Sequence, residues 1–274
     1  MRAPAWRIIW QPKGPFSVGA DLSAVVPLLQ AGDFDAFESV VRKFQRTTTR
    51  LRDASVPVVG AAQGFALGGG CEFLMYCDHV VAAMETYVGL VEVGVGLLPA
   101  GGGCTALAQR AATEAVDGDI FRQLKAPFEA VAMGKVAKSA FEAQDMGLLR
   151  RSDTVILNPN ELLYVALQWA RALAESGYRP LLPKTVPVAG RTGIANLQTI
   201  MANMEAGGFI SEHDYLIGEK IAVALCGGEI DGGIEVDEAW LLGLERQAFV
   251  ALARTEQTQA RIDHMLKTGK PLRN

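Results

Sequence analysis

Two glutamates in apolar surroundings and a run of glycines are the residues of this chain best suited to chemistry. The glycines at positions 68–70 follow the apolar stretch 56–67 and lead into Glu72, and Glu92 comes twenty residues later. The first N–H groups of a helix have no intrahelical partner, and the helix dipole favours negative charge there. Glycine lets another molecule approach that backbone closely. The pattern predicts an oxyanion site with a carboxylate beside it, which suits chemistry on a carbonyl.

A reaction next to the carbonyl of an acyl thioester places negative charge on the thioester oxygen as an enolate. Two fixed N–H donors can hold that charge. We predict that Gly69 supplies one donor at the start of the helix. The second must come from another loop, and Ala20 is the best candidate because Gly19 permits a tight bend that would aim the Ala20 N–H inward.

The two glutamates could supply the acid and the base of such a reaction. Adding water across a C=C bond conjugated to the carbonyl needs a base for the water and an acid for the α-carbon. Burial raises a carboxyl pKa, and two neighbouring carboxylates push their pKa values apart, so Glu72 and Glu92 suit a proton shuttle. Each feature alone also has a structural explanation: an acid in an apolar run is often a surface residue, and Asp21 is expected to cap the helix after it.

Composition narrows the class of protein and of partner. The 274 residues are half apolar and one-fifth charged, with a net charge of −4, so neither nucleic acid nor an anionic membrane is indicated as the main partner. Four scattered cysteines in apolar stretches predict reduced, buried thiols and a cytoplasmic protein. Three widely separated histidines argue against a zinc site. The uncharged stretch 54–71 contains a proline and five glycines, which indicates a buried strand and turn rather than a membrane span.

Hydrophobic periodicity predicts strands that alternate with helices, and hence an α/β layered domain. The expected strands are residues 7–10, 56–62, 79–83 and 154–157, and the expected helices are 34–52, 70–76, 103–110, 136–146 and 161–175. Residues 178–190 contain three prolines and predict a linker. Beyond it the pattern is all-helical, with a weak capping box at Ser211 and Asp214.

Four stretches in a fixed order make the chain resemble the crotonase (enoyl-CoA hydratase/isomerase) superfamily: residues 14–22, 56–78, 88–102 and 143–149. The resemblance implies an α/β crotonase-like (ClpP/crotonase) fold, a spiral of β-β-α units. It implies a core at residues 1–190, without the first strand and helix of its relatives, and a C-terminal helical region at residues 191–274. The helical tail is similar to the hydratase portion of bacterial bifunctional 3-hydroxyacyl-CoA dehydrogenases, which leaves room for an upstream NAD-binding dehydrogenase domain in a longer protein. No dinucleotide-binding glycine motif follows a strand in this chain.

The same resemblance assigns roles to residues. It implies that Ala20 and Gly69 form the oxyanion hole, that Glu72 activates water and that Glu92 delivers the α-proton. The implied substrate-binding positions are Val18, Gly19, Asp21, Leu22, Gly68 and Ala100. Since relatives that hydrate keep both glutamates, we expect trans-2-enoyl-CoA to be converted to 3-hydroxyacyl-CoA in fatty-acid β-oxidation.

The expected partner is an acyl-CoA thioester, with coenzyme A as part of the substrate and no metal or redox cofactor. The resemblance also implies a homo-oligomer, a trimer or hexamer. Two alternatives stay open. One is a Δ3-Δ2 enoyl-CoA isomerase, which needs a single base. The other is a non-catalytic acyl-CoA-binding or assembly fragment of a dehydrogenase.

Overall fold

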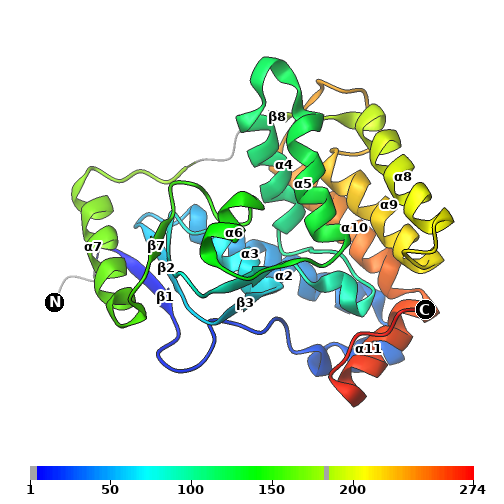
Figure 1. Ribbon diagram of the computed structural model, residues 1–274, viewed down its shortest axis with the longest axis horizontal. Coiled ribbons are helices and arrows are strands. Elements are labelled where there is room, and N and C mark those ends of the chain that lie inside the picture. The colour runs from blue at the N-terminus through cyan, green and yellow to red at the C-terminus, as the bar shows by residue number, and fades with distance from the viewer. Residues whose placement is uncertain (1–4, 182–184) are drawn as a thin grey trace. The chain divides into compact units, whose positions relative to one another are not determined.

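A computed structural model describes residues 5–181 and 185–274, which form two compact units (Figure 1). The sheet unit comprises residues 5–20, 46–90 and 136–181. The helical unit comprises residues 21–45, 91–135 and 185–274. Each unit therefore draws on separate parts of the chain, and the family-core boundary expected at residue 190 stays a prediction.

The sheet unit contains two small sheets. The first is parallel throughout, in the order β1-β2-β4-β7, with β1 (Arg7–Trp10), β2 (Val58–Ala62), β4 (His79–Ala83) and β7 (Thr154–Ile156). The second has the order β3-β5-β6, with β3 (Phe65–Leu67), β5 (Tyr87–Gly89) and β6 (Val136–Ala137), and β6 runs antiparallel to β5.

Two successive strand pairs of the sheet unit, β2-β3 and β4-β5, lie side by side and run parallel. Strand β2 leads through a short turn into β3, and β4 leads likewise into β5. The first pair lies against the second, with Gly60 opposite Val80 and Ala66 opposite Val88. Helix α3 (Gly69–Met75) follows the first pair directly. This is the β-β-α unit that the family resemblance implied.

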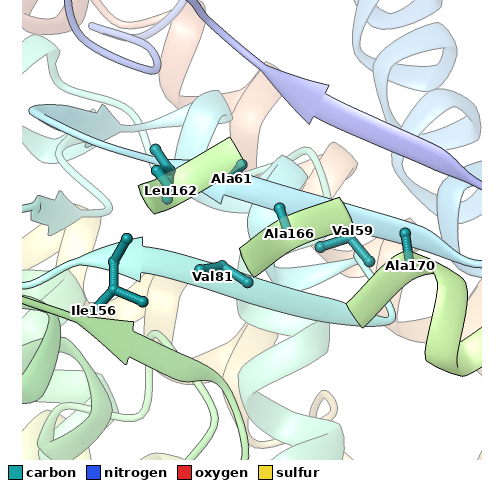
Figure 2. Close-up of a cluster of buried hydrophobic side chains, with 7 residues drawn as sticks. All are labelled: Val59, Ala61, Val81, Ile156, Leu162, Ala166 and Ala170. Atoms are coloured by element: carbon teal, nitrogen blue, oxygen red, sulfur yellow. The ribbon is translucent and has the colours of Figure 1, made fainter. Parts of the chain in front are cut away.

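Helix α7 (Leu162–Glu175) covers one face of the parallel sheet (Figures 1 and 2). Its small residues Ala166 and Ala170 pack against Val59 and Val81, so the helix can approach the sheet closely. On the opposite face, a Cβ added at Gly60 would lie 2.7 Å from the Leu74 side chain of α3. Every residue of β2 is buried, as expected of a strand covered on both faces.

The helical unit is built mainly from long helices. It contains α1 (Val26–Gln30), the first part of α2 (Phe34–Arg52), α4 (Gly103–Glu114), α5 (Ile120–Ala132), α8 (Gly190–Ala206), α9 (Glu212–Leu225), α10 (Glu238–Ala253) and α11 (Glu256–Thr268). A short antiparallel pair, β8 (Val186–Pro187) and β9 (Glu235–Val236), packs with Ala108 and Leu241 in a small apolar cluster. Helix α9 contacts α4, α5, α8 and α10, so it is the central helix of this unit.

Most of the predicted elements are confirmed, including α2 and the capping box of α9 at Ser211 and Asp214. The helix predicted at residues 136–146 is wrong in its first half. Val136 pairs with Gly89 as part of β6, and the helix that follows, α6 (Ala140–Asp145), begins only after its cap Ser139. Strand pairing with a distant segment overrides the local helical pattern here.

Several further elements were not predicted, namely β3, β5, α5 and β9, which lies in a region expected to be all-helical. Within the expected linker 178–190, residues 182–184, which include Pro183, lie outside the described residues. Further along the same stretch, β8 pairs with β9. All four cysteines are buried and free, as predicted. Across residues 5–181 and 185–274, each helix is too short or too polar to cross a membrane.

Candidate active site

The start of α3 has the geometry that its glycines predicted. Gly68 precedes the helix, and its N–H donates to the Gly89 carbonyl at 2.8 Å, which ties the helix start to β5. Gly69 is the first helical residue, one position earlier than predicted, so its N–H has no acceptor within the helix. Glu72 lies in the first turn and is only 2% exposed. The helix dipole at this end favours an anion, whether a bound oxyanion or the Glu72 carboxylate.

The segment with Val18, Gly19 and Ala20 is attached to the strand that leads into α3. Ser17 forms a parallel bridge with Ala66, and Leu67 N–H donates to the Ser17 carbonyl at 3.1 Å. Ala20 and Gly69 each lie three residues after the bridge. Because the bridge is parallel, the two chains leave it in the same direction. Gly19 has a φ of +104° and donates its N–H to Ser17 Oγ at 3.2 Å, which is the tight bend that the sequence predicted.

Close packing joins this segment to the helix. A Cβ added at Gly70 would lie 2.6 Å from Ser17 Oγ, so the segment can pack against α3 only because Gly70 has no side chain. Val18 is 69% exposed and Ala20 is exposed, so the bend is open to a ligand. The sheet unit therefore packs the segment that leads to Ala20 against the helix start that carries Gly69 and Glu72. The convergence of the Ala20 and Gly69 N–H groups on one oxyanion stays a prediction.

Arg150 supports the other end of α3. Its guanidinium donates to the carbonyl oxygens of Cys77, of Asp78 at 2.8 Å and of Met75 at 3.4 Å. Carbonyls at a helix C-terminus lack intrahelical donors, and a cation there also complements the helix dipole. Arg150 was not identified from the sequence, since its partners lie more than seventy residues away and no local motif marks it.

Asp78 links the end of α3 to the start of β2. Its carboxylate accepts the Val58 N–H at 2.7 Å and the Tyr178 hydroxyl at 3.0 Å, which fixes the start of β2 beside the end of α3. Burial raises the pKa of Asp78. Burial also raises the pKa of the Cys77 thiol to about 12, so this cysteine is a packing residue rather than a nucleophile.

Glu92 lies in the helical unit, at the first position of the 3-10 turn η2 (Glu92–Val95). Its side chain is partly buried, and its carbonyl accepts the Leu97 N–H at 3.1 Å. Ala100 is 4% exposed and lies in the loop between η2 and α4. These are the two positions for which the resemblance implies delivery of a proton and positioning of substrate.

The start of α4 resembles that of α3 in sequence, but its N–H groups are already hydrogen-bonded to a side chain of this chain. Glycines at positions 101–103 lead into α4, yet the N–H groups of Gly102 (at 3.0 Å) and Thr105 donate to the carboxylate of Glu245 from α10. Glu245 is fully buried. The protein therefore fills this helix start with its own anion, and this carboxylate was also missed at the level of the sequence.

Asp21 caps the turn that follows it, as predicted. Its Oδ1 accepts the N–H of Ser23 at 3.0 Å and the Ser23 hydroxyl at 2.6 Å, and these bonds lower the pKa of Asp21. Leu22 opens that turn, η1 (Leu22–Ala24), and is partly buried. Both residues lie in the helical unit with Glu92 and Ala100. The pairing of Glu72 with Glu92, and the substrate contacts of the individual residues, stay predictions.

Sequence comparison adds a family match and longer relatives. The family model for enoyl-CoA hydratase/isomerase matches residues 11–181. A Bacillus subtilis (strain 168) protein named probable 3-hydroxyacyl-CoA dehydrogenase is 41% identical over 259 residues, which cover 94% of this chain and 33% of that protein. The fatty acid oxidation complex subunit alpha of Idiomarina loihiensis is 31% identical over 258 residues, which cover 93% of this chain and 33% of that protein. The chain thus spans about a third of the length of the curated relatives it matches.

Solved structures show the same fold. The crystal structure of enoyl-CoA hydratase from Bacillus halodurans aligns with a TM-score of 0.59 at 16% identity, over 94% of this chain and 80% of that one. An enoyl-CoA hydratase/isomerase from Xanthobacter autotrophicus Py2 aligns with a TM-score of 0.58 at 17% identity, over 97% and 77%. The fold that the sequence predicted is therefore confirmed.

Proposed function

Because the chain belongs to the enoyl-CoA hydratase/isomerase family, we propose that it hydrates trans-2-enoyl-CoA thioesters to 3-hydroxyacyl-CoA. One observation carries this proposal. The start of α3 combines the Gly69 N–H, the attached bend with Ala20 and the buried Glu72. The presence of a second glutamate, Glu92 on η2, favours hydration over isomerisation, since isomerisation needs one base.

In the proposed reaction, the N–H groups of Ala20 and Gly69 hold the thioester oxygen. The Glu72 carboxylate takes a proton from water as the water oxygen bonds to the β-carbon, and the C=C electron pair moves toward the thioester as an enolate. Glu92, protonated at the outset, gives its proton to the α-carbon. Overall, one O–H bond of water and the C=C π bond are broken, and one C–O and one C–H bond form. A proton passed from Glu72 to Glu92 then restores both groups.

The proposed chemistry requires no electron acceptor, because hydration neither oxidises nor reduces the substrate overall. The N–H donors stabilise the enolate that a metal ion would otherwise have to stabilise. We therefore propose that the coenzyme A moiety of the substrate is the sole coenzyme involved.

Product mass distinguishes the proposed reaction from its alternatives. The purified chain is incubated separately with a 2-enoyl-CoA and with a 3-enoyl-CoA, and the products are resolved by mass spectrometry. Hydration adds the mass of one water to the 2-enoyl substrate, whereas isomerisation of the 3-enoyl substrate adds none. Isomerisation alone would overturn the hydratase assignment. Binding of either thioester without turnover would instead support a non-catalytic acyl-CoA-binding fragment.

The names of the longer relatives suggest the next step for the product. The relatives are named as a dehydrogenase of 3-hydroxyacyl-CoA and as a fatty acid oxidation complex subunit. We propose that this chain supplies 3-hydroxyacyl-CoA to such a dehydrogenase in fatty-acid oxidation. Adding a separate 3-hydroxyacyl-CoA dehydrogenase and NAD to the hydration reaction should produce NADH. Absence of NADH in the presence of the hydrated product would contradict the product assignment.

A further inference from the structure

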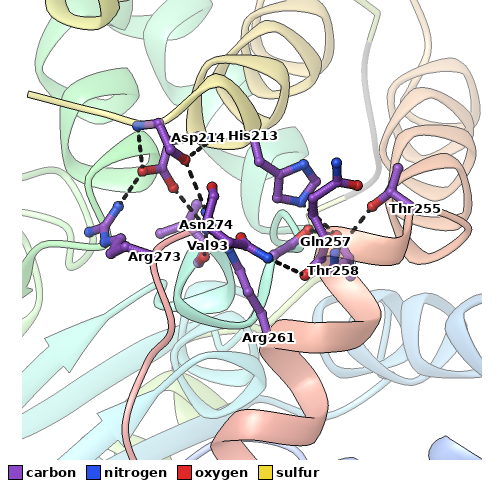
Figure 3. Close-up of polar contacts among 11 residues, drawn as sticks. Val93, His213, Asp214, Thr255, Gln257, Thr258, Arg261, Arg273 and Asn274 are labelled. Carbon is purple, nitrogen blue, oxygen red and sulfur yellow. Dashed lines mark hydrogen bonds and ion pairs between the residues drawn. The ribbon is translucent and has the colours of Figure 1, made fainter. Parts of the chain in front are cut away.

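A cluster of buried polar side chains from α9 and α11 lies against η2, the turn that carries Glu92 (Figure 3). Arg261 and Thr258 of α11 are fully buried, and His213 and Asp214 of α9 are each 5% exposed. Burying charged and polar groups is costly unless each is paired. We therefore ask which part of the backbone the cluster holds in place.

Two of these side chains donate hydrogen bonds to the backbone of η2 and its cap. Arg261 Nη1 donates to the carbonyl of Val93, which is adjacent to Glu92, at 3.2 Å. Thr258 Oγ1 donates to the carbonyl of Gly96 at 2.7 Å. The two side chains thus hold the turn at both ends, and we call this pair the η2 clamp.

The packing of Gly96 shows how closely the turn and α11 approach. Gly96 has a φ of +81°, and a Cβ added there would lie 2.7 Å from Thr258 Oγ1 and 2.8 Å from Thr258 Cα. The turn is therefore in direct contact with the helix that carries the clamp. Because a 3-10 turn has poorer internal hydrogen-bond geometry than an α-helix, these outside contacts matter more for its position.

Other buried groups fix the orientation of Arg261. Asp214 Oδ1 pairs with Arg261 Nη1 at 2.8 Å, and Asn274 Oδ1 accepts from Arg261 Nε at 2.7 Å. Asp214 also belongs to the capping box of α9 and pairs with Arg273 at 2.8 Å. The guanidinium that reaches η2 is therefore held by a carboxylate on a well-capped helix.

Thr258 is oriented by His213. Since the single hydroxyl proton of Thr258 is donated to Gly96, its oxygen must accept the hydrogen bond from His213 Nε2, which lies 2.9 Å away. This requires the imidazole to carry a proton on Nε2. Burial and the nearby Arg261 lower the pKa of His213, which is consistent with a neutral ring of that tautomer.

We propose that Thr258 and Arg261 are positioning residues, which fix η2 so that Glu92 is held ready to transfer the α-proton. The inference rests on the proposed function for its catalytic consequence. Neither residue is proposed to touch the reacting atoms. Arg261 acts through the backbone next to Glu92, and Thr258 acts through the cap of the same turn. Each lies more than 160 residues further along the chain than its partner.

Three variants test the proposal. Thr258→Val removes the hydroxyl while keeping a branched side chain of similar size, and Thr258→Ser keeps the hydroxyl. Arg273→Gln is the matched control, because the hydrogen bond of Arg273 goes to the same Asp214 and not to the backbone of η2. For each variant we would measure kcat and KM for hydration of a short 2-enoyl-CoA, thermal stability, and hydrogen exchange of the peptide containing the Leu97 amide.

The expected result is a loss confined to turnover. Thr258→Val should lower kcat about 10- to 100-fold, as expected for a misplaced catalytic group, with KM within about threefold of wild type. Thr258→Ser should restore kcat to within about threefold of wild type. Arg273→Gln should lower thermal stability while leaving kcat within about twofold, since its hydrogen bond goes to Asp214 rather than to the backbone of η2. Exchange at Leu97 should accelerate in Thr258→Val alone.

Wild-type kcat in Thr258→Val, or a loss of kcat that Thr258→Ser does not recover, would overturn the positioning role. Unchanged exchange at Leu97 would show that the clamp does not hold η2. If the wild-type chain itself fails to hydrate 2-enoyl-CoA, the proposed function fails, and the exchange measurement still decides whether Thr258 restrains the turn.

Discussion

Replacing Gly70 by alanine tests whether the bend at residues 17–20 must pack against α3 for catalysis. The added Cβ would overlap the Ser17 side chain, with Ser17 Oγ only 2.6 Å away. Non-bonded heavy atoms prefer separations of about 3.5–4.0 Å, so Ser17 or α3 must shift by roughly 1 Å. Ser17 is hydrogen-bonded to β3 on one side and leads to Ala20 on the other, so the shift displaces the predicted second N–H donor.

The magnitude follows from the loss of one donor. Removing one oxyanion donor typically costs about 10²–10³ in rate, or roughly 2.7–4 kcal/mol of transition-state stabilisation. Overpacking should also lower the free energy of unfolding by about 1–3 kcal/mol. We therefore expect Gly70→Ala to remain folded, with kcat for hydration reduced about 10²–10³-fold. Steady-state kinetics on a 2-enoyl-CoA and thermal unfolding measure the two effects.

Two further variants separate this explanation from general damage. Ser17→Gly removes the overlapping side chain together with the Oγ that accepts the Gly19 N–H, so this single variant is the reference. The double variant with Gly70→Ala should have the same kcat as Ser17→Gly within about threefold, because the added methyl group no longer meets a side chain. Gly243→Ala is the matched control, because a Cβ added at this position in α10 meets nothing within 4 Å. It should stabilise the helix by about 0.5–1 kcal/mol with unchanged kcat. A folded Gly70→Ala variant with wild-type kcat would refute the reasoning, as would a double variant whose kcat lies far below that of Ser17→Gly.

Three other predictions concern the acids, the support of α3 and the histidines. Glu72→Gln and Glu92→Gln should each lower kcat by about 10²–10⁴-fold while retaining binding of a saturated acyl-CoA, and full turnover in both would contradict their proposed roles. Arg150→Met should lower the free energy of unfolding by about 1–3 kcal/mol, because carbonyl groups at the end of α3 lose their donors; an unchanged denaturant midpoint would contradict this support. Burial lowers the pKa of both His79 and His213 below the value of 6.5, so below that pH the unfolded chain binds more protons than the folded one. Stability should therefore be full above about pH 6.5 and fall as the pH is lowered, and His213→Gln should make the fall in Tm shallower; equal slopes would refute the linkage.

Local patterns in the sequence were sufficient for much of the fold and for the chemistry of α3. The helix at Phe34–Arg52 and the strand at His79–Ala83 have the bounds that periodicity predicted. The Ser211 and Asp214 capping box was identified from a spacing of three residues. Gly69 and Glu72 were identified in the same way, because a helix start and its first turn are encoded within a few consecutive residues.

Predictions from local sequence patterns were wrong or incomplete where pairing with a distant segment decides the conformation. Residues Val136 and Ala137 continue a helical pattern, yet they pair with β5 because the edge of that strand offers hydrogen-bond partners. The role of Glu245 was equally hidden, since the helix start that it fills lies about 140 residues earlier in the chain. A carboxylate in an amphipathic helix carries no local mark of such a partner.

The sequence by itself determined the family, the glycine-rich start of α3 and the two acids proposed for catalysis, because each depends on residue type and short spacing. Only the tertiary structure decided how the segment with Ser17 and Gly19 packs against α3, how Arg150 supports the far end of that helix, and how Thr258 and Arg261 hold the turn of Glu92. These contacts join residues far apart in the chain. They form because close packing leaves no water to satisfy the buried carbonyl groups, which must instead be paired by whatever donor the fold brings to them.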